Sequence, residues 1–367
     1  MNSVDQRHAG GSRYIFLDGI RGLAAIFVLT RHTTFFWDGN PFFRSYLAVD
    51  IFFIMSGFVI ASAYEEKLRS SLITINDFIL IRIIRLYPVY FVSFLLCCYH
   101  FIRKVSLGYE HGSSEEVALV LLSTAFFLPS KMPSSDALFP LNGAYWSLFF
   151  ELLANFSYAL VRPVLNDFLL TFVSALFGLL VATAAVQNGG LDNGFKWDTW
   201  MIVGGLSRAF FGIFLGLLIF RKQKSLNNVF RGLNAPWLAV FVVMLVLMSP
   251  SVGVFDPFVD VAVVLVVFPA CLIVASNGTS QAGNILIFLG SASYPIYVLH
   301  FPLGQGIYLR AQNAVVSTAP YSGLAFVVFI MIFSVWFERV YDIPIRRKLT
   351  TLLMTRRNSC KVPAQAS

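Results

Sequence analysis

Long apolar runs, each close to the length of a membrane crossing, are the feature that most limits what this chain can fold into. A helix needs roughly 20 apolar residues to cross the hydrocarbon core of a bilayer. Because ten such runs follow one another, the sequence predicts an all-α polytopic membrane protein with about ten transmembrane helices. The runs cover residues 15–36, 47–64, 86–102, 145–162, 165–186, 201–220, 236–250, 258–276, 286–307 and 321–341.

Composition excludes the soluble alternatives. Hydrophobic residues make up 57% of the 367 residues and charged residues 13%, against roughly 45–50% and about 25% in soluble globular chains. So few charges cannot cover a water-soluble surface, and so many apolar residues exclude disorder. The net charge is +8. Its basic residues lie between the apolar runs, where membrane topology explains them better than nucleic-acid binding does. The four cysteines lack metal-ligand spacing, so neither a metal site nor a disulfide framework is expected.

Basic residues cluster after the second run, after the sixth run and in the C-terminal tail. Loops rich in Lys and Arg face the cytoplasm, so these segments and both termini are predicted to be cytoplasmic. The clusters comprise Lys67, Arg69, Arg82 and Arg85; Arg221, Lys222, Lys224 and Arg231; and Arg346, Arg347, Lys348, Arg356, Arg357 and Lys361. The expected organisation is a cytoplasmic tail over 1–13, one transmembrane domain over 14–345 and a basic cytoplasmic tail over 346–367.

This orientation decides the place of a shorter apolar run at residues 116–130. Counting back from a cytoplasmic tail puts residues 131–144 outside, and the third span also leaves the membrane outward. Residues 103–144 therefore begin and end on one side, and 116–130 is predicted to be re-entrant or interfacial. The first run exceeds signal-peptide length and lacks an A-x-A site, so it is predicted to remain as a span.

Ionisable residues inside the first span are candidates for function, since each costs a few kcal/mol or more in lipid. Arg21 and His32 lie eleven positions apart, which is three turns plus about 20°, so they share one helix face about 16 Å apart. Asp18 lies three residues before Arg21 and can pair with it. A snorkelling Arg21 is the structural alternative. His32, in the outer third, is the candidate general base because imidazole is partly neutral near pH 7.

Two further ionisable residues lie toward the outer side. The fourth span begins with Trp146 and Ser147, and Glu151 lies about a turn and a half inside, at a depth comparable with His32. Its carboxylate needs a partner there, and His32 is one candidate; a structural Glu–Arg pair is the alternative. His300 lies in the outer part of the ninth span, where a core histidine and a site histidine are equally compatible with the sequence.

The second span and the segment after it carry ambiguous polar residues. Asp50, near the outer end, fits either an interfacial cap or a site carboxylate. Ser56 and Gly57 favour close helix packing. Arg82 and Arg85 share a helix face at the cytoplasmic boundary, where they fit either anchoring to lipid phosphates or a clamp for a phosphorylated cytosolic ligand.

The candidates thus divide by depth. Acid–base residues are expected toward the outside and arginines toward the cytoplasm, as if an anionic cytosolic donor reached up to an acceptor arriving from outside. The outer group is His32, Glu151, His300 and Asp50, and the inner group is Arg21, Arg82, Arg85, Arg346 and Arg347. A positive flank of the last span also explains the last two arginines.

Six segments in order over residues 15–347 resemble the membrane acyltransferase type 3 family, which O-acetylates bacterial surface polysaccharides, peptidoglycan and related glycans. They read LDGIRGLAAIFVLTRH, AVDIFFIMSGF, RIIRLYPVY, YWSLFFE, LGSASYPIYVLHFPL and YDIPIRR. The resemblance implies a bacterial inner-membrane enzyme that takes an acyl group, most often acetyl, from acyl-CoA as donor substrate, with no permanently bound cofactor. Its partners would be acyl-CoA, a saccharide acceptor and membrane lipids.

The combined interpretation assigns roles to residues. His32 would deprotonate the acceptor hydroxyl, Glu151 would orient or polarise His32, and Arg21 would complete the catalytic group. The donor phosphates would bind near Arg82, Arg85, Arg346 and Arg347, and the supporting residues would be Asp18, Asp50, Ser56, Trp146, Ser147, Tyr294 and His300. A covalent acyl-His32 intermediate is a less favoured variant. The competing readings are a transporter of lipid-linked saccharides and a non-catalytic membrane scaffold.

Overall fold

The computed structural model describes residues 14–109, 111–229, 235–278 and 283–360, and that part of the chain contains helices and no strand. The predicted N-terminal tail and the end of the C-terminal tail lie outside the described residues. The helices are α1 Ile15–His32, α2 Ala48–Arg69, α3 Ile75–Ser106, α4 Ser114–Ala125, α5 Tyr145–Val161, α6 Asp167–Asn188, α7 Thr199–Val229, α8 Pro236–Met248, α9 Asp256–Ala262, α10 Phe268–Ser276, α11 Gly283–Ser317, α12 Tyr321–Phe337 and α13 Ile343–Cys360. Short 3-10 or π turns are η1 Thr34–Phe36, η2 Phe43–Leu47, η3 Arg162–Val164, η4 Gly253–Phe255, η5 Val263–Val267 and η6 Glu338–Asp342.

Every predicted apolar run coincides with helix, the run 258–276 being divided among α9, η5 and α10. Within the described residues, seven helical stretches are long and apolar enough to cross a membrane. They are Phe43–Arg69, Ile75–Ser106, Asp167–Asn188, Thr199–Gln223, Gly253–Ser276, Gly283–Ser317 and Tyr321–Leu353. The multi-pass, all-helical architecture is confirmed. The count of ten and the cytoplasmic placement of both ends stay predictions, since α5 and α8 are short and α1 carries several charges.

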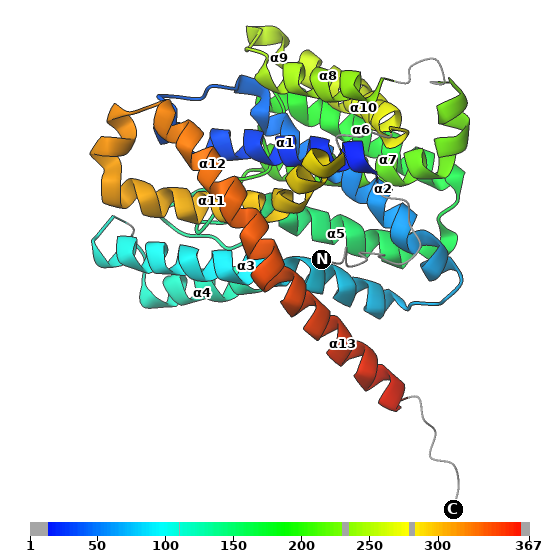
Figure 1. Cartoon of the computed structure of the whole chain (residues 1–367), viewed down its shortest axis with the longest axis horizontal. Coiled ribbons are helices and arrows are strands. Elements are labelled where there is room, and N and C mark those ends of the chain that lie inside the picture. Colours follow the sequence, from blue (N-terminus) through cyan, green and yellow to red (C-terminus); the bar gives the residue numbers. More distant parts are fainter. Residues whose placement is uncertain (1–13, 110, 230–234, 279–282, 361–367) are drawn as a thin grey trace, which may run out of the picture.

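In the helix bundle, α1 packs against α11 and α2 packs against α7 (Figure 1). α1 and α11 run in the same direction, because Arg21 contacts Ser293 and His32, further along α1, contacts His300, further along α11. These helices are the predicted first and ninth spans. Because successive spans cross the membrane in alternating directions, two odd-numbered spans are expected to be parallel. The α1–α11 pair brings together two helices separated by most of the sequence, and it carries the candidate base.

Small residues let α2 and α7 approach until their backbones touch. A Cβ atom added to Gly57 would lie 2.0 Å from the backbone oxygen of Ile213, and one added to Gly216 would lie 2.1 Å from that of Ile54. The prediction that Gly57 serves helix packing is therefore confirmed.

We expect Gly57→Ala to lower the thermal stability of the detergent-purified protein. The added methyl group has no space without moving a backbone, and such overpacking costs about 1–3 kcal/mol. Gly143→Ala is the matched control, because nothing lies within 4 Å of a Cβ atom added there. Equal unfolding temperatures for the two variants would contradict the close approach of α2 and α7.

The segment predicted not to cross the membrane forms α4, a twelve-residue helix that begins at a capping box of Ser113 and Glu116. At 1.5 Å per residue it is about 18 Å long, too short for a hydrocarbon core of about 30 Å. It packs beside α3 (Figure 1). Its re-entrant or interfacial place stays a prediction. At the other end of the chain, α13 extends away from the rest of the helices (Figure 1).

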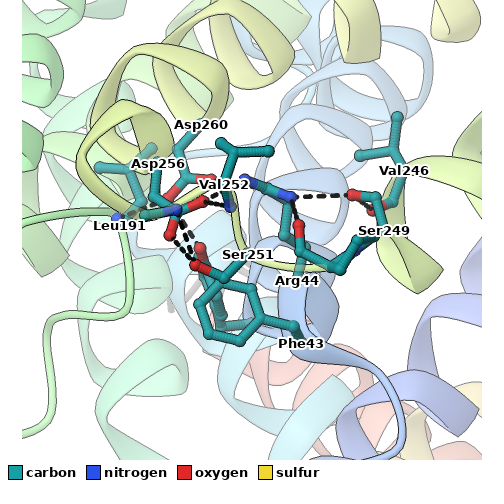
Figure 2. Close-up of polar contacts among 12 residues, drawn as sticks. Phe43, Arg44, Leu191, Val246, Ser249, Ser251, Val252, Asp256 and Asp260 are labelled. Carbon is teal, nitrogen blue, oxygen red and sulfur yellow. Dashed lines mark hydrogen bonds and ion pairs between the residues drawn. The ribbon is translucent and has the colours of Figure 1, made fainter.

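A buried ion cluster that the sequence did not predict fixes the short turn between α1 and α2. Arg44 of η2 binds Asp256 and Asp260 of α9 and donates to Ser249, 3.1 Å away (Figure 2). All three charged side chains are at most 8% exposed. Asp260 also accepts from the backbone N–H of Leu191 at 2.9 Å, so the cluster ties the α6–α7 connection to the same end of the bundle.

Candidate active site

Two histidines from different helices face one another. His32 Nδ1 at the end of α1 lies 2.8 Å from His300 Nε2 of α11, and the two rings are nearly parallel with centroids 5.1 Å apart. His300 is fully buried, whereas His32 is partly exposed. The sequence placed both at the same depth, and the structure joins them into one pair.

The neighbours of His300 decide which nitrogens carry protons. His300 Nδ1 lies 2.9 Å from the backbone oxygen of Ile296, which only accepts hydrogen bonds, so Nδ1 must donate. In the neutral ring Nε2 is then an acceptor, and His32 Nδ1 donates to it. The second nitrogen of His32, Nε2, is left with its lone pair. His32 Nε2 is therefore the atom of the pair able to take a proton.

Ser293, Tyr297 and His300 share one face of α11, at positions i, i+4 and i+7, and Ser293 and His300 contact α1. Arg21 donates to Ser293 at 3.0 Å and to the backbone oxygen of Gly290 at 3.1 Å. It also pairs with Asp18 at 2.9 Å, as predicted. Arg21 and His32 share the helix face that packs on α11, which confirms that part of the sequence analysis.

A cavity of about 130 Å³ lies between α1, α2, α3, α5 and α11. Seven of the predicted site residues line it: Arg21, Ser56, Arg82, Arg85, Ser147, Glu151 and Tyr294. The other lining residues include Phe52, Phe53, Leu148, Ser293 and Tyr297. Arg21 and Arg82 have carboxylate partners, Asp18 and Glu151, whereas Arg85 forms no ion pair with a described residue. The remaining positive charge suits the cavity to an anion.

Glu151 lies in this cavity, and its predicted pairing with His32 is wrong. Its carboxylate pairs with Arg82 at 3.0 Å and accepts from Ser56 at 2.6 Å. The structural Glu–Arg alternative is the correct one. The predicted division by depth therefore fails for Glu151, which groups with the arginines.

Two hydroxyls meet at the boundary between the cavity and the histidine pair. The Ser147 and Tyr297 hydroxyls contact each other, and both lie near the backbone oxygen of Ala144, at 3.2 Å and 3.1 Å. The Tyr297 ring lines the cavity, and its centroid lies 6.3 Å from that of His300. Tyr297 thus lies between the arginine-lined space and His300.

A family described as acyltransferase domain matches residues 14–339, nearly the whole chain. The chain belongs to this acyltransferase family. It is therefore a multi-pass membrane enzyme that transfers acyl groups. No solved structure matches the acyltransferase.

Three relatives show which proteins the acyltransferase is similar to. It is 39% identical over 184 residues to "Protein 2 in picA locus" of Rhizobium radiobacter, covering 47% of this chain and 95% of that protein. It is 27% identical to the exopolysaccharide production protein ExoZ of Rhizobium meliloti, over 71% of this chain and 77% of the relative. It is 25% identical to the peptidoglycan O-acetyltransferase OatA of Listeria monocytogenes, over 78% of this chain. The chain spans about half (49%) of that longer relative.

The two arginines at the start of α13 do not line the cavity of the acyltransferase. Arg346 pairs with Asp342 at 2.7 Å and lies 3.9 Å from Glu338, and Arg347 is exposed. Since α13 packs against α3, these arginines flank the arginine-bearing helix. Their role in donor binding stays a prediction.

Asp50 and Trp146 belong to the scaffold of the acyltransferase. Asp50 forms a two-point ion pair with Arg208 of α7, at 2.9 Å and 2.7 Å, and both side chains are 1% exposed. The Arg208 guanidinium lies over the Trp146 ring, 5.4 Å from its centroid. Arg208 also donates to the backbone oxygens of Leu191 and Asn193. The partner of Asp50 is thus this buried arginine, and a supporting role of Asp50 at the site stays a prediction.

Sequence reasoning missed Tyr297 and Ser293 of the site. The signal was present, because both share a helix face with His300 at positions i−3 and i−7, and His300 was already a candidate. Arg208 was missed as well, although it lies inside the predicted span 201–220, where a charge needs a partner.

Proposed function

We propose that this acyltransferase moves an acetyl group from cytosolic acetyl-CoA to a hydroxyl of an extracytoplasmic or lipid-linked saccharide in a bacterial inner membrane. The observation that carries the proposal is the contact between His32 Nδ1 and His300 Nε2, which in a neutral pair leaves His32 Nε2 as the proton acceptor. Arg21 lines the arginine-containing cavity toward the other end of α1. Two relatives, named for exopolysaccharide production and peptidoglycan O-acetylation, support a saccharide acceptor.

The cavity suits the donor. Arg82 and Arg85 would bind nucleotide phosphates, which guanidinium groups contact with two parallel hydrogen bonds. The pantetheine arm would extend along α1 toward His32, over the roughly 16 Å that separates Arg21 from His32. The Glu151–Arg82 ion pair holds one guanidinium in place before the donor arrives.

The chemistry is a direct transfer. His32 Nε2 takes the proton of the acceptor hydroxyl while that oxygen attacks the thioester carbonyl carbon. The carbonyl oxygen becomes an oxyanion. When the carbon–sulfur bond breaks, the sulfur leaves as a thiolate and receives the proton from His32, which gives the O-acetyl ester and free CoA. His300 keeps His32 in the correct tautomer throughout.

Radiolabelled acetyl-CoA added to inverted membrane vesicles that contain the protein tests this function. The expected result is label in the saccharide fraction, in amounts that depend on His32. A transporter would move saccharide without labelling it, and a scaffold would do neither. Absence of label with every envelope saccharide fraction of the source cells would refute the proposal.

We expect Arg85→Ala to weaken acetyl-CoA binding by about 10–100-fold, since a hydrogen bond to a charged group contributes about 1.5–3 kcal/mol. Arg85 lines the cavity and forms no ion pair with any residue that the structure describes. Isothermal titration of the detergent-purified protein measures the dissociation constant. Arg69→Ala is the control, because Arg69 is exposed and pairs with Glu66 outside the cavity. Equal affinity for the Arg85 variant and the wild type would assign Arg85 to lipid anchoring instead.

A further inference from the structure

The hydroxyl group of Tyr297 has no role in the chemistry above, yet Tyr297 lines the cavity proposed for the donor and its ring lies beside His300. Tyr297 is 5% exposed, lines the cavity, and packs its ring edge-on against Phe52 with centroids 5.4 Å apart. It lies one turn before His300 on α11, a rise of about 4.5 Å. Its hydroxyl is therefore on the donor side of the histidine pair.

The hydrogen bonds around this hydroxyl leave its proton free to change partner. Ser147, Tyr297 and the Ala144 backbone oxygen form three contacts. Two hydroxyls have only two protons, so one of the three contacts always lacks a proton. When Ser147 donates to Tyr297, the Tyr297 proton is the one that can turn from Ala144 to another acceptor.

This arrangement favours a negatively charged acceptor. A hydroxyl that accepts one hydrogen bond becomes a stronger donor in the next, because bonds in a chain polarise each other. Turning the proton from a neutral carbonyl to an oxyanion replaces a neutral hydrogen bond with a charge-assisted one, which is about twice as strong. The exchange is therefore favourable only once negative charge develops, as transition-state stabilisation requires.

We propose that Tyr297 is a catalytic residue, whose hydroxyl donates to the thioester carbonyl oxygen as it becomes an oxyanion. Ser147 is a positioning residue that donates to Tyr297. As the acceptor oxygen bonds to the carbonyl carbon, the π electrons move onto the carbonyl oxygen, and the Tyr297 proton stays on tyrosine and bridges to it. When the carbon–sulfur bond breaks, the charge passes to sulfur and Tyr297 returns to Ala144. This assignment rests on the proposed function.

Tyr297→Phe removes the donor and keeps the ring that packs on Phe52 and His300. We expect kcat to fall by about 10²–10³-fold, the typical effect of losing one oxyanion donor, with the acetyl-CoA dissociation constant and unfolding temperature unchanged. Tyr90→Phe is the matched control. Tyr90 is a buried tyrosine that does not line the cavity, and its hydroxyl donates to the Thr124 backbone oxygen at 2.5 Å, so kcat should stay within about threefold of wild type.

A second measurement separates catalysis from structure. Trifluoroacetonyl-CoA carries an activated ketone, and its adduct with an attacking oxygen resembles the oxyanion. We expect the Tyr297→Phe variant to bind this analogue at least about tenfold more weakly than wild type does. Binding of acetyl-CoA should be unchanged. A Ser147→Ala variant should show the same selective loss to a smaller extent. Equal kcat and equal analogue binding for Tyr297→Phe and wild type would overturn the assignment while leaving the proposed function intact. A wild-type protein that transfers no label, by contrast, would refute the proposed function itself.

Discussion

Replacing His32 with alanine is expected to lower acetyl transfer by about 10²–10⁴-fold, the usual contribution of a general base. The variant loses the nitrogen that accepts the hydroxyl proton, and nothing else in the pair replaces it, because His300 Nδ1 is occupied by Ile296 and His300 Nε2 is buried. Transfer of radiolabel from acetyl-CoA to saccharide in membrane vesicles measures the effect. Acetyl-CoA affinity should stay the same, since His32 does not line the cavity.

His111→Ala is the matched control for this variant. His111 is exposed on the connection between α3 and α4 and should tolerate the change with wild-type transfer. Wild-type activity in the His32 variant would remove the mechanism. Label that remains on the protein after denaturation, and that disappears with His32→Ala, would instead favour the covalent acyl-histidine variant over direct transfer.

The apolar runs predicted where the helices lie because each helix must satisfy its own backbone in lipid. The apolar runs also identify three polar residues inside predicted spans as candidates for function: His32, His300 and Glu151. Residue spacing placed Arg21 and His32 on one face, and the structure puts that face against α11. Each of these inferences concerns a single helix, because residue periodicity shows which residues share a face of one helix and not which helices pack together.

The partner of Glu151 could not be predicted from its own helix. The apolar run of the third span begins near residue 86, which predicts that Arg82 and Arg85 lie at the membrane boundary. The helix instead begins at Ile75 behind a capping box of Thr74 and Asp77. Arg82 therefore lies about 10 Å along α3, deep enough to reach Glu151. The capping sequence was the missed signal.

The buried ion pairs show a second limit of sequence reasoning. Arg44 and Arg208 find carboxylates more than 150 positions away in the chain, and only the packing of η2, α7 and α9 selects them. A sequence shows that such a charge needs a partner but not which partner. The same holds for His300, because the ring that it contacts, His32, lies on another helix, α1.

Removing His300 should be nearly as damaging as removing His32, although His300 touches no substrate. His300→Leu takes away the acceptor for His32 Nδ1, so His32 can place its proton on either nitrogen and its ring can rotate. A base held in the wrong tautomer loses activity even when it is present, and we expect transfer to fall by about 10²–10⁴-fold. Transfer of radiolabel from acetyl-CoA, with acetyl-CoA affinity as the reference that should not change, measures the loss.

His300→Gln distinguishes this positioning role from simple packing. A glutamine amide oxygen reaches about as far as His300 Nε2 and can accept from His32 Nδ1, so this variant should recover much of the activity that His300→Leu loses. Leucine fills the buried site with an apolar side chain of similar size, and packing alone would favour it over glutamine, because a buried amide costs free energy unless it is hydrogen-bonded. A glutamine variant no more active than the leucine variant, with both proteins folded, would show that the hydrogen bond from His32 to His300 does not set the tautomer of the base.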